Sequence, residues 1–222
     1  MAAGKSGPEE CLALMSQGAA ELGLALKPER LAGLCRYYQE LDRWRHKINL
    51  VATGSRRDLV ARHFLDSLTL LPHLPPGSIS LLDVGCGAGF PGLALKVARP
   101  EISLTLVEPR GKRVTFLRHV VRTLGLTGVT IVGERLTGPG QHGLGHFDLI
   151  TSRAFTDLAG FLPLVEDYLA PSGRIIAMKG PKADEELRAW QQGQPDTSLA
   201  LRERVTYEIP FLVRSHQLLI FS

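Results

Sequence analysis

The sequence predicts an α/β protein in which a helical subdomain precedes a mostly parallel, doubly wound sheet of seven strands that ends in an antiparallel hairpin. Three observations lead to this fold class. Apolar residues recur at helical spacing up to Leu71, short apolar runs then alternate with helical stretches, and the last two extended runs are separated only by a loop. Alternation of strand and helix is typical of a parallel sheet covered by helices, whereas strands joined by a loop pair antiparallel.

Three amphipathic helices are expected in the first third of the chain. Residues 9–24 and 58–71 carry apolar side chains at helical spacing, and Pro28 opens another helix whose stripe reaches Leu41. Residues 72–77 hold three prolines and a glycine, which cannot continue a helix. We therefore place an internal boundary there, with an N-terminal helical subdomain at 1–75 and a second domain at 76–222.

The second domain alternates between short apolar runs and helical stretches. Because parallel strands end at the same edge of a sheet, a ligand is expected at their carboxyl ends. Five strands are expected at 79–84, 103–108, 129–132, 147–152 and 174–179, with helices at 91–98, 112–124 and 158–169 and a final hairpin at 205–209 and 217–221.

Composition limits the class of protein more than it identifies a function. Cys11, Cys35 and Cys86 lie far apart, which argues against a zinc site or a disulfide framework, so no metal is expected. Residues 1–5 do not lead into the apolar run of a signal peptide, and no stretch has the roughly 18 apolar residues of a membrane span. We expect a soluble cytoplasmic protein. A net charge of +4 and a pI near 9.1 are compatible with a nucleic-acid partner but do not demand one.

A glycine-rich turn follows the first strand of the second domain. Gly85, Gly87 and Gly89 let the backbone turn sharply and approach a ligand closely. Gly87, Gly89 and Gly92 also satisfy the G-x-G-x-x-G pattern, with Glu108 near the distance expected for a ribose contact. An NAD(P)-dependent oxidoreductase is therefore a serious alternative.

Two acidic residues favour S-adenosylmethionine as the cofactor. Asp83 stands two residues before the first glycine, where a carboxylate would oppose a pyrophosphate at the helix N-terminus. S-adenosylmethionine has no phosphate, and its sulfonium and ammonium groups are cationic, so an acidic rim complements them. Glu108, at the end of the second strand, suits the two ribose hydroxyls. A non-catalytic S-adenosylmethionine-binding module stays open as a further alternative.

The motifs resemble those of the ribosomal RNA small subunit methyltransferase G family, also known as glucose-inhibited division protein B. The resemblance implies a Rossmann-like class I methyltransferase fold and transfer of a methyl group from S-adenosylmethionine to N7 of a guanine in the decoding-region loop of 16S ribosomal RNA. It covers about Trp44 to Gly180. The motifs that carry it are Asp83 to Leu93, Val107-Glu108, Gly111-Lys112-Arg113, Ser152-Arg153-Ala154-Phe155, Lys179-Gly180 and, in the helical third, Trp44, Asn49-Leu50, Arg62-His63 and Asp66-Ser67.

The same resemblance implies roles for individual residues. Gly85 and Phe90 would line the methionine and adenosine side of the cofactor, Leu136 and Thr137 would border the adenine, and Arg153 would stand where the cofactor and target base meet. The chain departs from the family at two positions. Thr137 replaces a usual acidic residue, and Arg45 follows the tryptophan where the family has asparagine.

The expected chemistry needs no general base. After residues 147–150 there is no Asn-Pro-Pro-Tyr motif of amine methylation and no Pro-Cys nucleophile of carbon methylation. Guanine N7 carries a free lone pair, so it can attack the methyl carbon without losing a proton. Catalysis then depends on alignment. We expect Arg153 to be catalytic by fixing the base through its planar guanidinium, the alternative being an arginine paired with a carboxylate at the rim of the sheet.

Basic residues are the candidates for contact with the RNA. We predict that Arg110, Lys112, Arg113 and Lys179 bind phosphates, although a solvated helix face would look the same in sequence. The expected partner is 16S ribosomal RNA or the small ribosomal subunit, approached by a monomer. Further basic residues that could contribute are Arg43, Arg45, His46, Lys47, Arg56, Arg57, Arg62, His63, Arg118 and Arg122.

Some conspicuous side chains are expected to serve packing alone. Trp44 and Tyr38 stand at core spacing, and His63 is more typical of a helix-packing residue than of a catalyst. Asp66 is expected to pair with Arg62 one helical turn earlier.

Overall fold

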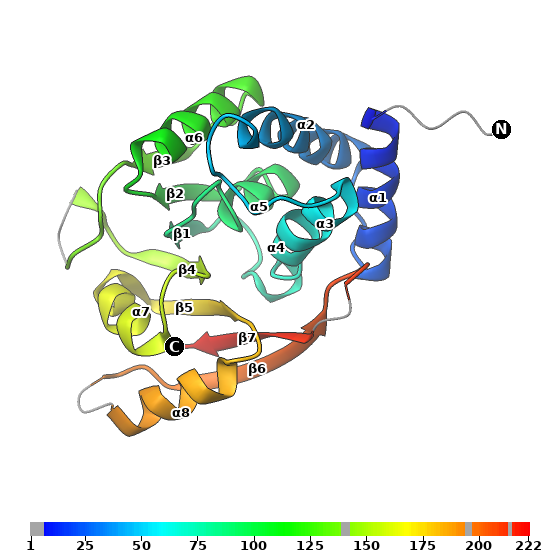
Figure 1. Cartoon of the computed structure of the whole chain (residues 1–222). Coiled ribbons are helices and arrows are strands. Elements are labelled where there is room, and N and C mark those ends of the chain that lie inside the picture. Colours follow the sequence, from blue (N-terminus) through cyan, green and yellow to red (C-terminus); the bar gives the residue numbers. More distant parts are fainter. Residues whose placement is uncertain (1–6, 139–142, 194–196, 213–214) are drawn as a thin grey trace.

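The centre of the protein is a seven-stranded sheet in the order β3-β2-β1-β4-β5-β7-β6. The computed structural model describes residues 7–138, 143–193, 197–212 and 215–222. Strands β1 to β5 run parallel, and β7 pairs antiparallel with both β5 and β6, as Figure 1 shows. This arrangement confirms the predicted fold class. The strands are β1 Ser80–Val84, β2 Ser103–Val107, β3 Val129–Val132, β4 Phe147–Arg153, β5 Leu169–Lys179, β6 Leu201–Glu208 and β7 Ser215–Phe221.

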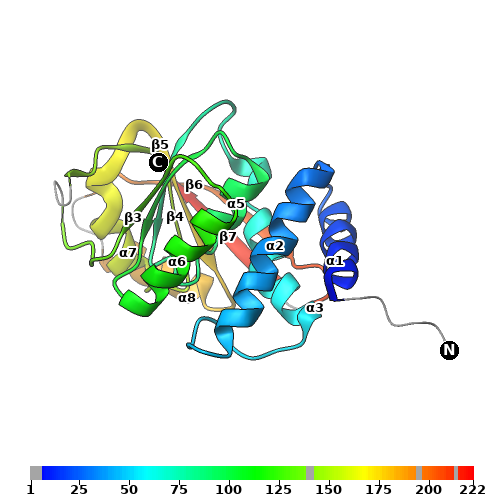
Figure 2. The same cartoon turned by 90° about the horizontal axis from the view of Figure 1, so that it is seen from above.

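Helices cover both faces of the sheet. In Figures 1 and 2, α7 and α8 lie on one side of the strands, and the N-terminal helices lie with α5 and α6 on the other. Each face is buried because apolar side chains alternate along the strands. The helix bounds are α1 Gly7–Glu21, α2 Pro28–Arg45, α5 Gly92–Ala98, α6 Gly111–Thr123, α7 Leu158–Val165 and α8 Ala183–Gly193.

The hydrophobic core has two parts, one on each face of the sheet. The larger part joins Tyr37 and Phe64 of the N-terminal helices to Leu81 and Leu104 of the sheet. The N-terminal helices therefore share a core with the second domain, and the boundary near Pro75 stays a prediction. The smaller part contains Leu82, Val84, Leu158, Phe161, Leu187 and Trp190.

The third predicted helix, 58–71, is wrong as a continuous α-helix. A short α3 (Arg56–Leu59) leads into a π-helical turn η1 (Val60–Leu65), then α4 (Asp66–Leu68) and a 3₁₀ turn η2 (Leu71–His73). The spacing of apolar residues predicted one continuous helix, because that spacing is not sensitive to a single widened turn. Such a turn leaves backbone groups for other partners. Here the carbonyl of Arg62 accepts a hydrogen bond from Arg153 Nη1 at 2.6 Å.

Helix α8, strand β5 and helix α7 also differ from the prediction. Helix α8 was missed, although Ala183, Leu187 and Trp190 are buried at helical spacing and acidic residues fill its first turn. Strand β5 begins at Leu169, before Pro171 and Gly173, because its pairing with β4 skips that segment as a bulge. Helix α7 stops at Val165 and continues only as the 3₁₀ turn η4 Glu166–Tyr168.

Within the described ranges, no helix is both long and apolar enough to cross a membrane. The same residues contain no group of three or more His, Cys, Asp or Glu side chains placed to hold a metal ion. The N-terminal residues 1–5, which argued against a signal peptide, lie outside the described ranges.

Candidate active site

The glycine turn connects β1 to α5 at the carboxyl edge of the sheet. Gly85 and Gly89 have φ angles of 71° and 94°, a region that side chains other than hydrogen disfavour. The packing of neighbouring side chains also requires glycine at these two positions. A Cβ on Gly85 would collide with the ring of Phe155, and one on Gly89 would stand 2.5 Å from the hydroxyl oxygen of Tyr37. The turn is thus fixed by its own backbone and by side chains from two other elements.

Asp83 lies beneath this turn and is fully buried. Its Oδ2 accepts a hydrogen bond from the backbone N–H of Gly92 at 2.7 Å, at the start of α5, whereas Oδ1 is buried without a partner. Burial raises the pKa of Asp83 to about 7. The carboxylate therefore occupies the helix N-terminus where a dinucleotide would need its pyrophosphate, which opposes the oxidoreductase alternative.

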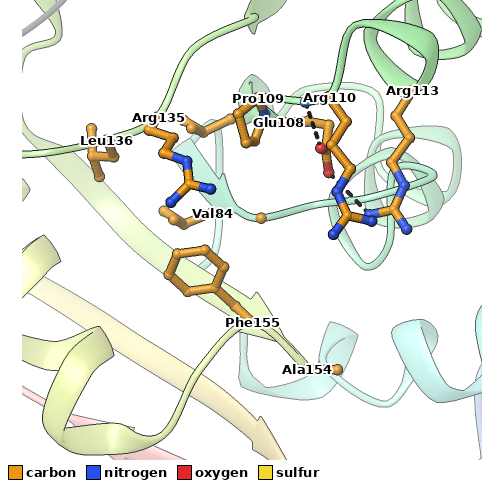
Figure 3. Close-up of a pocket in the computed structure, with 11 residues that line it drawn as sticks. Val84, Glu108, Pro109, Arg110, Arg113, Arg135, Leu136, Ala154 and Phe155 are labelled. Carbon is orange, nitrogen blue, oxygen red and sulfur yellow. Dashed lines mark hydrogen bonds and ion pairs between the residues drawn. The ribbon is translucent and has the colours of Figure 1, made fainter.

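Glu108 follows β2 and ties the glycine turn to the start of α6. Its Oε2 accepts from the N–H of Gly87 at 3.0 Å, and Oε1 accepts from the N–H of Arg110 at 2.9 Å. Arg113 Nη1 lies 3.4 Å from Oε2, and Figure 3 shows the contacts of Glu108 with Arg110 and Arg113. Only 2% of the residue is exposed. The carboxylate is therefore held in one orientation at the wall of a cavity.

That cavity has a volume of about 350 Å³ and opens where β1, β2 and β4 end. Its volume lies in the range of roughly 300–1,000 Å³ typical of small-molecule sites. Five predicted site residues line it: Gly85, Glu108, Arg110, Arg113 and Leu136. Val84, Val107, Pro109, Arg135, Ala154 and Phe155 complete the wall and were not predicted (Figure 3).

Six of the predicted cofactor-binding residues lie outside the wall of the cavity. Asp83 and Phe90 are buried below the turn, and Thr137 is exposed next to Leu136. Gly87 and Gly89 shape the turn from within, since Gly87 donates to Glu108 and Gly89 donates to the carbonyl of Cys86 at 2.8 Å. The sixth is Arg153.

Arg153 ends β4 but turns its side chain toward the N-terminal helices. Nη1 donates to Asp66 Oδ2 at 3.0 Å as well as to the carbonyl of Arg62, and Nη2 lies 3.1 Å from His63 Nδ1. The guanidinium also lies 5.3 Å from the centre of the Phe90 ring. In this arrangement Arg153 is paired with a carboxylate, which matches the alternative considered for it.

The expected pair of Asp66 with Arg62 is wrong. Asp66 binds Arg153 and accepts from the Tyr207 hydroxyl at 2.7 Å, while Arg62 lies 3.8 Å from Asp58. Helical spacing suggested a local pair, but the π-helical turn directs Asp66 inward to residues far away in sequence. Asp66 is accordingly 6% exposed.

Aromatic side chains fill the space between the helices and the glycine turn. Phe90 stacks on Tyr37 at 5.2 Å and on His63 at 5.2 Å, measured between ring centres. Burial, together with Arg153, lowers the pKa of His63 to about 3, so its ring is neutral at physiological pH. Packing roles are confirmed for Trp44, which lies 5.7 Å from Phe116, and for Tyr38, which lies 6.2 Å from Phe64.

The predicted RNA-binding residues differ in whether their side chains are exposed or already bonded to other residues. Arg110 and Lys112 are exposed at the start of α6, and Arg113 is partly held by Glu108. Lys179 is engaged, since its Nζ lies 2.7 Å from Glu186 Oε2 and donates to the carbonyl of Thr156 at 2.7 Å. Four arginines near the N-terminus also have acidic partners, in the pairs Arg43–Glu40, Arg45–Asp42, Arg56–Glu10 and Arg62–Asp58.

The residues at this edge of the sheet fit S-adenosylmethionine. Glu108 provides a fixed carboxylate at the cavity, and the buried Oδ1 of Asp83 has no hydrogen-bond partner among the described residues. Both acids complement a cationic ligand. Gly85 brings the backbone to the wall without a side chain, and Leu136 supplies apolar surface for an adenosyl group.

Comparisons with known proteins agree with this geometry. The sequence model of the family described as rRNA small subunit methyltransferase G matches residues 30–218. A ribosomal RNA small subunit methyltransferase G from Desulfotalea psychrophila is 43% identical over 199 residues, covering 89% of this chain and 91% of the relative. The protein of that name from Myxococcus xanthus is 37% identical over 210 residues, covering 94% and 95%.

A solved structure of a SAM dependent methyltransferase from Aquifex aeolicus has a TM-score of 0.54 at 17% identity, covering 74% of this chain and 92% of the other. At that identity the likeness shows a shared fold. The family match and the two relatives extend over most of the chain. This protein therefore belongs to the rRNA small subunit methyltransferase G family and is an S-adenosylmethionine-dependent methyltransferase.

Proposed function

We propose that this protein transfers the methyl group of S-adenosylmethionine to N7 of a guanine in the decoding-region loop of 16S ribosomal RNA. The observation that carries the proposal is the joint presence of the family match and a cavity in which Glu108 faces the glycine turn. Guanine N7 is an acceptor with a free lone pair, so the reaction needs no proton removal. The sequence and the site contain no amine-methylation or carbon-methylation motif that would favour another atom.

The proposed cofactor site uses three groups of residues. Glu108 receives the ribose hydroxyls, Leu136 and Thr137 border the adenine, and Gly85 gives the methionine portion close access to the backbone. Asp83, Gly87, Gly89 and Phe90 act from below by fixing the turn. Support for this division comes from the cavity wall and from the bonds that Asp83 and Glu108 make to the turn.

When bound, S-adenosylmethionine supplies an electrophilic methyl carbon. N7 of the guanine forms the new bond as the carbon–sulfur bond breaks, and the electron pair stays on sulfur. The protein contributes alignment, which can remove roughly 7 to 11 kcal/mol of the barrier. We propose that Arg153 takes part in this alignment from the end of β4, either by contact with the base or by holding the adjacent Ala154 and Phe155 against the helices.

The proposed complex consists of one copy of this protein and its RNA partner. Arg110, Lys112, Arg113 and Lys179 contact phosphates of the RNA, and the partner is 16S ribosomal RNA or the small ribosomal subunit that contains it. The enzyme works as a monomer in the cytoplasm, with residues 1–75 as a helical subdomain beside the catalytic domain. The exposure of Arg110 and Lys112 next to the cavity supports the contacts with phosphates.

One experiment tests the function directly. The protein is incubated with methyl-labelled S-adenosylmethionine and unmodified small ribosomal subunits, and the labelled nucleotide is mapped. Label at N7 of a single guanine in 16S RNA is the expected result. Label on another atom or another molecule would refute the proposal, binding without any transfer would favour the non-catalytic module, and tight NADH binding would revive the oxidoreductase alternative.

A further inference from the structure

Phe155 is an unusually exposed aromatic side chain at the wall of the cavity. Among the described residues, only Leu12 and Phe155 are large apolar side chains with a high exposed fraction, 44% and 42%. Leu12 lies on α1, away from any site named above. Phe155 lines the cavity together with Glu108 and Leu136. An exposed aromatic ring beside a ligand cavity is apolar surface kept open to solvent at the place where a substrate must arrive.

The backbone on both sides of the ring is adapted to place it. Ala154 has a φ of 52°, a left-handed conformation uncommon for alanine, and this turn directs Phe155 away from the end of β4. Opposite it, Gly85 has no Cβ, and a Cβ there would collide with the Phe155 ring. Figure 3 shows the ring pointing into the space bordered by Val84, Arg135 and Leu136.

The neighbouring aromatic rings are already engaged. Tyr37, Phe64 and Phe90 are buried and pack on one another, with ring centres 5.0 to 5.2 Å apart. In the described part of the chain Phe155 has one aromatic neighbour, Phe161, in an edge arrangement with ring centres 6.5 Å apart. The Phe155 ring lies against Gly85 on one side, and the 42% exposed fraction of the residue leaves ring surface for a planar ligand, whereas the buried rings near the glycine turn are covered.

We propose that Phe155 is the platform on which the target guanine stacks beside the cofactor. This inference rests on the proposed function, because it assumes that an RNA base is the methyl acceptor. A base taken out of an RNA loop loses its stacking partners, and proteins commonly replace them with an aromatic face. Phe155 stands two residues after Arg153, the last residue of β4, and its ring lies against Gly85, so a base stacked on it would lie beside the glycine turn that holds the cofactor.

The competing role for Phe155 is contact with the cofactor itself, and the experiment separates the two. Phe155→Ala, Phe155→Leu and Phe155→Tyr are compared with the wild type, with Leu12→Ala as a control of similar exposure. Methylation of unmodified small subunits is measured at saturating S-adenosylmethionine and varied subunit concentration. Cofactor affinity is measured separately by calorimetry.

We expect Phe155→Ala to reduce kcat/KM for the subunit by about tenfold to a hundredfold, the effect of losing one stacked base. Tyrosine should restore the rate and leucine should not, because leucine keeps apolar bulk without a planar face. Cofactor affinity should be unchanged in all three variants, and Leu12→Ala should behave as the wild type.

Three results would overturn the inference while leaving the proposed function intact. They are wild-type kcat/KM in Phe155→Ala, full rescue by leucine, or a loss of cofactor affinity equal to the loss of rate. A wild-type enzyme that does not label ribosomal RNA would refute the proposed function, and the stacking role would fall with it.

Discussion

Arg153 shows how a single side chain can serve both the site and the packing of the fold. It belongs to the last residues of β4, yet its guanidinium reaches the carboxylate of Asp66, the ring of His63 and a carbonyl of the π-helical turn. A planar fork with five donors suits such a multipoint contact better than a point charge does. The contacts hold the strand end that precedes Phe155.

We expect Arg153→Lys to keep its fold and most of its RNA binding but to lose turnover. An ammonium cannot make the same set of bonds in one plane, and a displacement of about 1 Å at a reacting group can cost on the order of a hundredfold in rate. Single-turnover methylation, with folding checked by circular dichroism, measures this. The control is Arg62→Lys, the same substitution at an exposed arginine that lies next to Arg153.

Arg153→Ala should behave differently, because it leaves Asp66 buried without its cation. Breaking such a pair typically costs about 3–5 kcal/mol. A folded Arg153→Lys protein with normal turnover would show that positive charge alone is sufficient. Normal turnover in Arg153→Ala would remove Arg153 from the mechanism.

Asp83 is the clearest case in which burial determines ionisation. Its carboxyl group is fully buried, with one oxygen bonded to Gly92 and the other without a partner, and its pKa is raised to about 7. In the unfolded chain an aspartate has a pKa of about 3.9. Between these values the folded protein keeps a proton that the unfolded chain releases.

The free energy of unfolding should therefore carry a contribution from Asp83 that is complete below about pH 4 and is lost as the pH rises to about 7. Its size is roughly 1.4 kcal/mol for each pH unit of that window. Urea unfolding of the wild type and of Asp83→Asn at several pH values isolates it, because asparagine keeps an acceptor for Gly92 but does not titrate there. Parallel pH profiles for the two proteins would contradict this account of Asp83.

Among the strands, helices and turns, the sequence best predicted the features that depend on residues close together in the chain. Apolar runs identified all seven strands, and the glycine spacing located the turn after β1, since both depend on neighbours in sequence. The partner of Asp66 could not be found in this way, because it depends on a π-helical turn that brings β4 and β6 to the same side chain.

The residues that line the cavity likewise divide into those that the sequence could predict and those that it could not. Glu108 and Gly85 follow strands directly, so their position was predictable from strand ends. Phe155 and Arg135 reach the cavity through the conformation of irregular segments, for which the sequence has no periodic signal. The left-handed φ of Ala154 is an example, since alanine gives no indication of it.

Helix α2 should stabilise the glycine turn through one hydroxyl group. Tyr37 is fully buried, and its hydroxyl donates to the carbonyl of Ala88. Tyr37→Phe leaves that carbonyl unpaired and should lower the free energy of unfolding by about 1–3 kcal/mol. Tyr37→Ala also removes the ring stacked on Phe90 and should cost roughly 3–5 kcal/mol. Urea unfolding measures both, and a Phe variant as stable as the wild type would exclude a role for the hydroxyl.

In the molecule as a whole, exposed basic side chains follow one another along α6, beginning beside the cavity. The formal net charge is only +4, and many basic residues of the N-terminal helices are neutralised by nearby acids. The exposed side chains of Arg110, Lys112, Arg118 and Arg122 around α6 have no ion pair in the described structure. Attraction of a phosphate chain should therefore be strongest along α6, where the cofactor cavity opens.

Replacing Arg110, Lys112 and Arg113 together by alanine should flatten the slope of log affinity against log salt for RNA binding. Each lost phosphate contact should change that slope by about 0.7, because each contact releases counterions from single-stranded RNA. The matched control is the triple alanine replacement of Arg174, Arg188 and Arg202, which removes equal charge from β5, α8 and β6. If attraction depended only on net charge, both variants would lose affinity equally. We expect the control to keep the wild-type slope, and equal slopes in the two variants would show that α6 is an ordinary solvated surface.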